Sequence, residues 1–339
     1  MQKFRFYYDQ LRLDDQRMLY IELEAAVLAM IDTVRVHMTP WLQQTGVPSA
    51  VMQILECVYG DNPELYYVKI WCGDCRPIGY EQVEVMLAYR LSTAEQIVCA
   101  ARMEAAVQDI LARLFPKGWE DLSQIRREKA IFDEIVDHVV YWHEAVERCG
   151  NVFREKNPMA WTSYGALVEH RAVCHGIAAA FKLLCDKVDL PCILVLGMAG
   201  ERHAWNIVSI GHRFFHVDCT WDLRTQINRQ IPYMRYRYLN LPDRMMLADR
   251  SVECEFLPAC KSLRYNPFAM RGMCIQDADS LLPMAAERIA AREERFAFLL
   301  DCEQHCIPTR NEVAHLLRLM TGKCVSVYRD PFYIGFVQG

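Results

Sequence analysis

The chain has 339 residues, with 38 basic and 43 acidic side chains and a net charge of −5. Its composition of 53% hydrophobic, 24% charged and 11% aromatic residues is that of a folded globular protein, so wholesale disorder is excluded. The nearly balanced, slightly acidic charge argues against nucleic acid as the main partner, because binding to phosphates favours a basic surface.

Hydropathy and cysteine content predict the compartment in which the protein is found. No stretch approaches the roughly 18 to 20 uninterrupted apolar residues that a membrane-spanning helix needs. The segment 1–16 is charged from its start and has no signal-peptide core. We therefore expect a soluble, cytoplasmic protein with no membrane partner. Its 15 cysteines, an odd number, are expected to be mostly reduced thiols.

The first third of the chain is predicted to alternate helices with short strands. Apolar residues that recur every four positions predict a helix from Asp14 to about Val36. A second helix is expected over 49–59. Strands are expected over 65–70 and 83–91 because these runs are rich in β-branched and aromatic residues.

A long helix then leads to a predicted domain boundary. Ser92 and Glu95 have the spacing of a capping box, and the helix that they open is expected to end before Pro116. The glycine- and tryptophan-bearing stretch 117–123 is interpreted as a hinge. We therefore assign residues 1–120 to an N-terminal accessory domain.

The middle of the chain, 121–225, is predicted to begin with a helix over 123–142. An apolar helix is expected from about Val173 to about Asp189. Three strands are expected to follow, over 192–199, 203–210 and 213–221. Gly211-His212 separates the last two and is typical of a two-residue hairpin turn.

Residues 226–339 are predicted to form a C-terminal extension that packs on the middle domain. A helix is expected over 281–300, and a final pair of strands over 324–328 and 332–337. Aromatic residues alternate with arginines over 233–238. This period of two fits a half-exposed strand better than a nucleic-acid stacking surface.

Cys174 is the candidate nucleophile. It is predicted at the first turn of a helix, where unpaired backbone N–H groups and the helix dipole favour a thiolate. A thiol must lose its proton to attack a carbonyl, so this position suits a nucleophile. Gly176 is expected to leave room for a substrate backbone. A cysteine at a helix start can also be structural, as buried thiols often are.

His203 and Asp218 are the candidate partners of the thiol. If Gly211-His212 form a two-residue turn, His203 faces Thr220 and Asp218 is its diagonal neighbour. A register shifted by two would place them directly opposite, and in both registers they share a face. A carboxylate there can accept one imidazole N–H and leave the other nitrogen for a thiol. The alternative is a buried Asp218 that pairs with structural groups.

Three segments together resemble the transglutaminase-like superfamily of papain-type cysteine enzymes: YGALVEHRAVCHGIAAAFKLLC (164–185), HAWNIV (203–208) and HVDCTWD (216–222). The shared pattern is a Cys that opens a helix in a VC-x-G-x-A context, a His in HAWN and an Asp in VD-x-TW. The resemblance implies that Cys174 is the nucleophile, His203 the general base and then acid, and Asp218 the orienting carboxylate.

The resemblance also implies the fold. We expect an α+β protein with a papain-like, transglutaminase-type core, in which a helix bearing the Cys packs on an antiparallel sheet bearing the His and the Asp. An N-terminal α/β accessory domain precedes this core and a C-terminal extension follows it. His175 departs from the pattern, since many relatives carry an uncharged residue there; an imidazolium would further favour the thiolate, unless the side chain points to solvent.

Three aromatic residues are further candidates for the site. Trp205 and Trp221 follow the His and the Asp closely and either line the cleft or belong to the core. Tyr164 is a candidate oxyanion donor beside the Cys174 N–H, and its alternative is also a core position.

No metal or organic cofactor is expected. WCGDC (71–75) resembles a redox CxxC, but a strand rather than a helix is predicted after it. HEAVE (143–147) lacks the second histidine of a zinc-protease helix, and no second CxxC completes a zinc site.

The resemblance implies acyl transfer through a Cys174 thioester, on an amide bond of a protein or peptide substrate. Hydrolysis by a cysteine protease or amidase is favoured, because water needs no binding pocket of its own. The alternatives are a protein cross-linking transglutaminase with an amine acceptor and a non-catalytic interaction module that retains the fold. A latent enzyme whose N-terminal domain covers the cleft is a further possibility.

Overall fold

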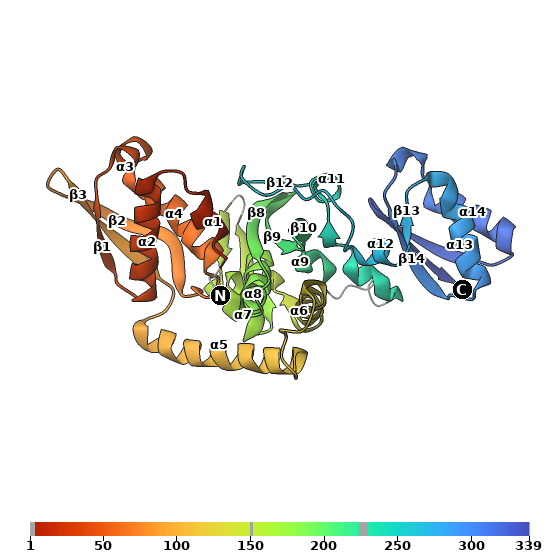
Figure 1. Ribbon diagram of the computed structural model, residues 1–339, viewed down its shortest axis with the longest axis horizontal. Helices are drawn as coiled ribbons and strands as arrows, with labels where there is room; N and C mark the ends of the chain where they lie inside the picture. Colours follow the sequence, from red (N-terminus) through yellow and green to blue (C-terminus); the bar gives the residue numbers. More distant parts are fainter. Residues whose placement is uncertain (1–3, 150–151, 224–229, 339) are drawn as a thin grey trace.

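The computed structural model describes residues 4–149, 152–223 and 230–338. Three parts follow one another along its longest axis: an N-terminal part, a central part and a C-terminal part, each with its own sheet (Figure 1). The predicted α+β class is confirmed. Within the described ranges no helix has the length and apolarity needed to cross a bilayer. The domain boundaries at 120 and 225 stay a prediction.

The N-terminal part packs helices on a three-stranded antiparallel sheet of order β1-β3-β2. Its elements are α1 (Phe6–Gln10), α2 (Asp14–Leu28), β1 (Thr33–His37), α3 (Pro40–Thr45), α4 (Val47–Asp61), β2 (Val68–Ile78) and β3 (Gln82–Tyr89). The predicted helix from Asp14 to Val36 is wrong beyond Leu28, because the β-branched run 33–36 pairs with β3 instead. The WCGDC segment lies inside β2, and no helix follows it directly.

Two helices connect this part to the centre. Ser92 caps α5 (Thr93–Leu114), and the predicted capping box is confirmed: the Ser92 N–H donates to the Glu95 carboxylate, and the Glu95 N–H donates to Ser92 Oγ. In Figure 1, α5 runs beneath both parts. The next helix, α6 (Gln124–His138), packs against α8 of the central part.

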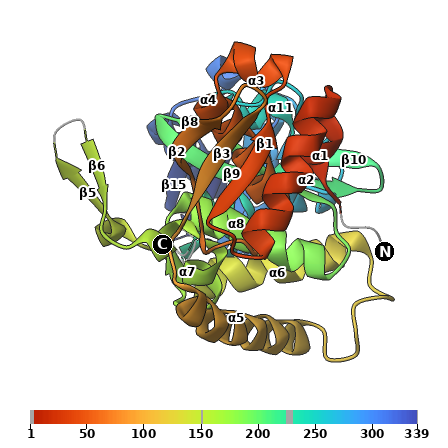
Figure 2. The same ribbon diagram turned by 90° about the vertical axis from the view of Figure 1, so that its left-hand side faces the viewer.

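The central part holds the predicted core. Its elements are β4 (Val140–Tyr141), η1 (His143–Ala145), β5 (Val146–Cys149), β6 (Val152–Glu155), η2 (Pro158–Trp161), α7 (Ser163–Leu167), β7 (Arg171–Ala172), α8 (Cys174–Lys187), β8 (Cys192–Ala199), β9 (Glu201–Ile210), β10 (Arg213–Val217), α9 (Cys219–Asp222), η3 (Pro232–Tyr236), β11 (Leu239–Leu241), α11 (Asp243–Met246) and β12 (Ser251–Val252). The hairpin of β5 and β6 extends away from the body of the molecule (Figure 2).

Five of these strands form one antiparallel sheet of order β11-β10-β9-β8-β12, and α8 packs across it. The Asn206 side chain on β9 donates to the Ala178 carbonyl on α8 at 3.0 Å. The predicted hairpin is confirmed: Gly211 and His212 have φ of 56° and 61°, and Ile210 pairs with Arg213. Both edge strands come from chain after residue 225, so the sheet draws on residues that the sequence assigns to the C-terminal extension.

The C-terminal part is a four-stranded sheet of order β13-β14-β16-β15 with two longer helices. Its elements are α12 (Pro267–Met270), β13 (Cys274–Ile275), η4 (Ala278–Ser280), α13 (Leu281–Ala290), β14 (Arg295–Leu300), η5 (Gln304–Cys306), α14 (Arg310–Thr321), β15 (Val325–Asp330) and β16 (Tyr333–Gln338). The predicted helix 281–300 is wrong in its second half: it stops at Ala290, and the buried run 296–300 forms a central strand. The strand predicted over 233–238 is also wrong, because η3 occupies most of it.

Candidate active site

Cys174 is the first residue of α8 and is half-buried. Its N-cap residue, Val173, has extended backbone angles, so the first-turn N–H groups of α8 lack acceptors within the helix. Gly176 fixes where the helix starts. A Cβ there would lie 2.5 Å from the Ala160 carbonyl oxygen and 2.8 Å from that of Thr162. The space that the sequence assigned to a substrate backbone at Gly176 is therefore filled by the chain's own backbone.

His203 and Asp218 are hydrogen-bonded. His203 lies on β9 and its Nε2 is 2.8 Å from Oδ2 of Asp218, which directly follows β10. Both side chains are buried. Since Nε2 is used, Nδ1 is the ring nitrogen left for the Cys174 thiol, which lies close enough to raise the pKa of His203. The structure therefore brings the three predicted catalytic residues together.

The protonation of His203 is set by opposing effects. Burial lowers its pKa, but the Asp218 carboxylate and the adjacent Cys174 side chain raise it to about 10. For Asp218, burial raises the pKa, while His203 and the guanidinium of Arg250 lower it below its ordinary value. At neutral pH the site therefore holds an imidazolium against a carboxylate.

Asp218 has four donors around its carboxylate. Oδ1 accepts the backbone N–H groups of Thr220 at 3.0 Å and of Trp221 at 3.3 Å, which makes Asp218 the N-cap of α9. Oδ2 accepts from His203 and also from Nη1 of Arg250 at 2.5 Å. Arg250 is a site residue that the sequence analysis missed, because it lies in a segment without a motif.

The two predicted tryptophans lie on different sides of His203. Trp205 is buried and its ring stacks on the imidazole, with ring centres 6.0 Å apart. Trp221 meets the imidazole edge-on at 6.2 Å and is 39% exposed. Trp221 therefore forms a solvent-facing wall beside His203, and Trp205 forms the floor. The floor needs Gly197, where a Cβ would lie 2.8 Å from the indole.

Tyr164 lies away from the triad. Its ring packs on Tyr66 with centres 5.2 Å apart, and the guanidinium of Arg102 lies over it. Its hydroxyl group is placed against Cys99 on α5. Among the described residues no interaction joins Tyr164 to Cys174. This placement does not fit the predicted oxyanion role and matches the alternative of a buried packing residue.

Tyr141 is close enough to Cys174 for the charge of the thiol to affect its phenol. Burial raises the pKa of its phenol to about 12, and the charges of Cys174 and Glu201 act in the same direction. Tyr141 follows α6 in β4, which pairs with β7 just before the nucleophile. The sequence carried no signal for this residue, because its position depends on that two-residue parallel pairing.

His175 is held on the other side of the helix start. Its Nδ1 donates to the Trp161 carbonyl at 2.6 Å, and its ring stacks on Tyr59 with centres 5.2 Å apart. Burial lowers the pKa of His175, so the ring is neutral at pH 7. The suggestion that a His175 imidazolium favours the thiolate is therefore not supported.

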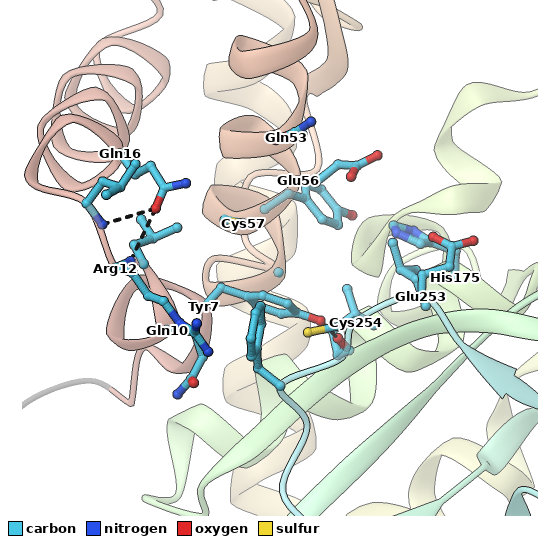
Figure 3. Close-up of a pocket in the computed structure, with 17 residues that line it drawn as sticks. Tyr7, Gln10, Arg12, Gln16, Gln53, Glu56, Cys57, His175, Glu253 and Cys254 are labelled. Carbon is cyan, nitrogen blue, oxygen red and sulfur yellow. Dashed lines mark hydrogen bonds between the residues drawn. The ribbon is translucent and has the colours of Figure 1, made fainter. Parts of the chain in front are cut away.

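A cavity of about 580 Å³ lies between the N-terminal helices, β8 and the segment 253–256 (Figure 3). It reaches α8 at His175, which Figure 3 shows at the same end as Glu253. Its described lining includes none of the three predicted catalytic residues. The cavity therefore does not include the site formed by Cys174, His203 and Asp218.

The central part has an α+β fold in which a helix bearing Cys174 packs on an antiparallel sheet. Kyphoscoliosis peptidase of Mus musculus is 27% identical to the chain over 143 residues, which is 38% of this chain and 20% of that protein. This relative supports the resemblance to the transglutaminase-like superfamily. The chain therefore spans about a fifth of the relative's length.

Two solved structures are also similar. The crystal structure of a TGase has a TM-score of 0.30 and 14% identity, with coverage of 43% of this chain and 43% of that chain. A proposed cysteine protease from Cytophaga hutchinsonii has a TM-score of 0.27 and 16% identity, with coverage of 41% of this chain and 51% of that chain. No protein-family model matches the chain.

Proposed function

We propose that the protein is a thiol-dependent acyl-transfer enzyme that hydrolyses amide bonds in a protein or peptide through a Cys174 thioester. The observation that carries this proposal is the joint placement of a thiol, an imidazole and a buried carboxylate. The Cys174 thiol lies close enough to His203 to raise the pKa of the imidazole, and His203 Nε2 lies 2.8 Å from Asp218. A module that only binds partners needs none of these contacts.

The chemistry follows from the groups present. His203 holds the thiol proton at Nδ1 as an imidazolium, and the Cys174 thiolate attacks the amide carbonyl carbon. When the tetrahedral intermediate collapses, the C–N bond breaks and the imidazolium returns its proton to the leaving amine. Water then attacks the thioester, and His203 removes a proton from that water. Asp218 stabilises the imidazolium throughout.

The developing oxyanion needs donors close to the sulfur. The first-turn N–H groups of α8, beginning with that of Cys174 itself, point out of the helix start and carry its positive dipole end. Tyr141 lies close enough to sense the Cys174 charge and is a second candidate donor. These groups replace Tyr164 in the proposal.

The test is the rate of alkylation of Cys174 by iodoacetamide as a function of pH, followed by peptide mass mapping. We expect rapid labelling well below the roughly 8.5 typical of a free thiol, and slower labelling in His203→Ala. Cys57 is an internal control, because burial and nearby carboxylates raise its pKa to about 12. Labelling of Cys174 that is slow and indifferent to His203 would overturn the proposal.

The acceptor is tested separately, with casein as substrate and a fluorescent primary amine as a second substrate. Release of peptides that is lost in Cys174→Ala supports hydrolysis. Incorporation of the amine without peptide release would identify a cross-linking enzyme instead.

A further inference from the structure

Arg250 lies directly before β12, and its side chain is fully buried against the active-site carboxylate. We propose that Arg250 is a positioning residue of the active site, which holds Asp218 in one orientation, balances its charge and supports Trp221 from beneath. The inference rests on the proposed function, since it assigns a role to Arg250 in that same site.

The first argument is geometric. An ionised carboxylate has about four acceptor positions. In Asp218 two are filled by the backbone N–H groups of Thr220 and Trp221, one by His203 and one by Arg250. Rotation of the carboxylate would break several of these bonds at once. Arg250 therefore fixes the oxygen to which His203 is bound.

The second argument concerns charge. With Cys174 as thiolate and His203 as imidazolium, Asp218 and Arg250 bring the four charges to zero. Without Arg250, Asp218 would neutralise His203 and leave the thiolate uncompensated beside two buried charged side chains, where charges interact strongly. Because Arg250 balances the charge of Asp218, Asp218 can orient the imidazole while the positive charge of the imidazolium still stabilises the thiolate.

The other titratable groups nearby do not replace this cation. They are His216, Cys219, Asp222, Tyr238, Asp249 and Arg237, whose guanidinium pairs with Asp222 and Asp330 and not with Asp218. Burial lowers the pKa of His216, which favours its neutral ring, and raises the pKa values of Cys219 and Asp222 well above their ordinary ranges, which favours their protonated forms. Asp249 lies 3.4 Å from Nε of Arg250 but is half-exposed, so its charge is screened by solvent.

The third argument concerns the aromatic rings around the Arg250 guanidinium. The guanidinium carbon lies 4.7 Å from the ring centre of Trp221, 4.9 Å from that of Tyr238 and 5.8 Å from that of Trp205. A planar, weakly hydrated guanidinium can stack on aromatic rings and donate to a carboxylate at the same time, which an ammonium does poorly. Arg250 thereby connects the carboxylate to the exposed wall of the cleft.

Two variants separate charge from shape. Arg250→Gln removes the charge and keeps a donor, and Arg250→Lys keeps the charge and loses the planar fork. Arg113→Gln is the matched control, because Arg113 also binds a buried carboxylate, Glu134, but outside the site. Thermal unfolding establishes that each variant is folded.

The primary readout is the titration of the His203 ring by NMR, which needs no activity. Loss of the neighbouring cation raises the pKa of His203, so in Arg250→Gln we expect its midpoint about one pH unit or more higher than in wild type. Arg250→Lys and Arg113→Gln should titrate as wild type. Iodoacetamide labelling of Cys174 at pH 7 should slow by at least about tenfold in Arg250→Gln and less in Arg250→Lys.

A folded Arg250→Gln with the wild-type midpoint and labelling rate would overturn the inference. If Arg250→Gln does not fold, Arg250→Lys is the deciding variant. We expect it to have the wild-type titration midpoint of His203 and slower labelling of Cys174. A wild-type labelling rate would overturn the role of the planar guanidinium. Failure of the proposed function would give a different result. The titration midpoint of His203 would then shift in Arg250→Gln, but the rate of Cys174 labelling would be the same in His203→Ala as in wild type.

Discussion

The indole N–H of Trp205 donates to Nδ1 of His216 at 3.0 Å, which fixes the proton of the His216 ring on Nε2. That proton is donated to Oδ1 of Asp243 at 2.9 Å. Trp205 stacks on His203, so the floor of the site is held by a hydrogen-bonded chain that ends at Asp243, outside the cleft.

This tautomer leads to a prediction about metals. Ligand atoms of His216, Asp243 and Cys260 lie within 4.8 Å of one another, a spacing that could hold a metal ion. However, a metal ligand needs the Nε2 lone pair, which carries a proton here. We expect no tight zinc binding by this cluster at neutral pH in a titration against a competing dye. One zinc per chain, lost in His216→Gln, would contradict this prediction.

The pH dependence of the site follows from His203. Burial lowers its pKa but Asp218 and Cys174 raise it to about 10, so the imidazolium that supports the thiolate persists far into the alkaline range. We therefore expect the His203 ring to titrate with a midpoint near pH 10, which NMR of the imidazole measures. A midpoint near 6.5 would contradict the raised pKa.

The same ion pair contributes to stability. The raised pKa of His203 gives a stabilisation that is fully present below its ordinary value of 6.5 and is lost as pH rises through about 10. The lowered pKa of Asp218 gives a second stabilisation, which is present above pH 3.8 and is lost as pH falls through the pKa of Asp218 in the folded protein. His203→Gln should therefore flatten the decline of the unfolding free energy between pH 7 and 10. Chemical denaturation between pH 7 and 10 measures the unfolding free energy of wild type and His203→Gln. The same dependence on pH in both would argue against the His203–Asp218 ion pair.

Glu128 should also make the stability of the protein depend on pH, but through burial of its carboxyl group and not through an ion pair. It is buried on α6, and burial raises its pKa from 4.5 to about 8, although a hydrogen bond from Asn240 lowers it. Between these values the folded protein holds a proton that the unfolded chain has lost, so stability should fall with rising pH by about 1.4 kcal/mol per unit.

Glu128→Gln should remove this loss and stabilise the protein at pH 8 relative to wild type, with little difference at pH 4.5. Urea unfolding at the two pH values measures the change. Exposed Glu120→Gln is the control, and equal effects of the two substitutions at pH 8 would contradict the prediction.

Gly176→Ala should damage the site more than the fold. The added methyl group meets backbone oxygens of Ala160 and Thr162, which cannot rotate away as a side chain could. We expect the start of α8 to shift and labelling of Cys174 to slow by at least about tenfold. Ala179→Gly on the same helix costs about 1 kcal/mol in helix propensity and should leave the labelling rate of the folded protein unchanged. Equal labelling in the two variants would show that the helix start tolerates the methyl group.

Asp61 should be needed to hold the first helix. Its carboxylate accepts the N–H groups of Tyr7 and Tyr8 and the Tyr20 hydroxyl, which joins α1, α2 and α4. Asp61→Ala leaves these donors without their acceptor and should cost on the order of 3 kcal/mol. Hydrogen exchange should show the loss in α1, whereas exposed Asp9→Ala should not. Unchanged protection of α1 would contradict this role.

The sequence predicted the features with local signals. The capping box at Ser92, the turn at Gly211-His212 and the helix that starts at Cys174 each depend on neighbouring residues, and the structure contains all three. The hairpin register then placed His203 and Asp218 on one face.

The errors arose where local patterns are ambiguous. The run 33–36 continues the helical spacing of α2, and the apolar run 296–300 follows α13 without a strong breaker, so only pairing with distant strands makes them β. Arg250 could not be predicted because its contact with Asp218 spans 32 residues and crosses the sheet. Tyr164 is a plausible donor in the sequence, but the N-terminal part of the chain packs over it.

The order of strands in the central sheet constrains how the protein is made. β11 and β12 flank the strands next to His203 and Asp218, yet both are synthesised after them. Until residue 252 has left the ribosome, β8 and β10 each present an open edge that can pair with another chain. A nascent or truncated chain that ends near residue 225 would also lack Arg250. Such a chain would hold all three predicted catalytic residues and still be a poorly formed, aggregation-prone fragment.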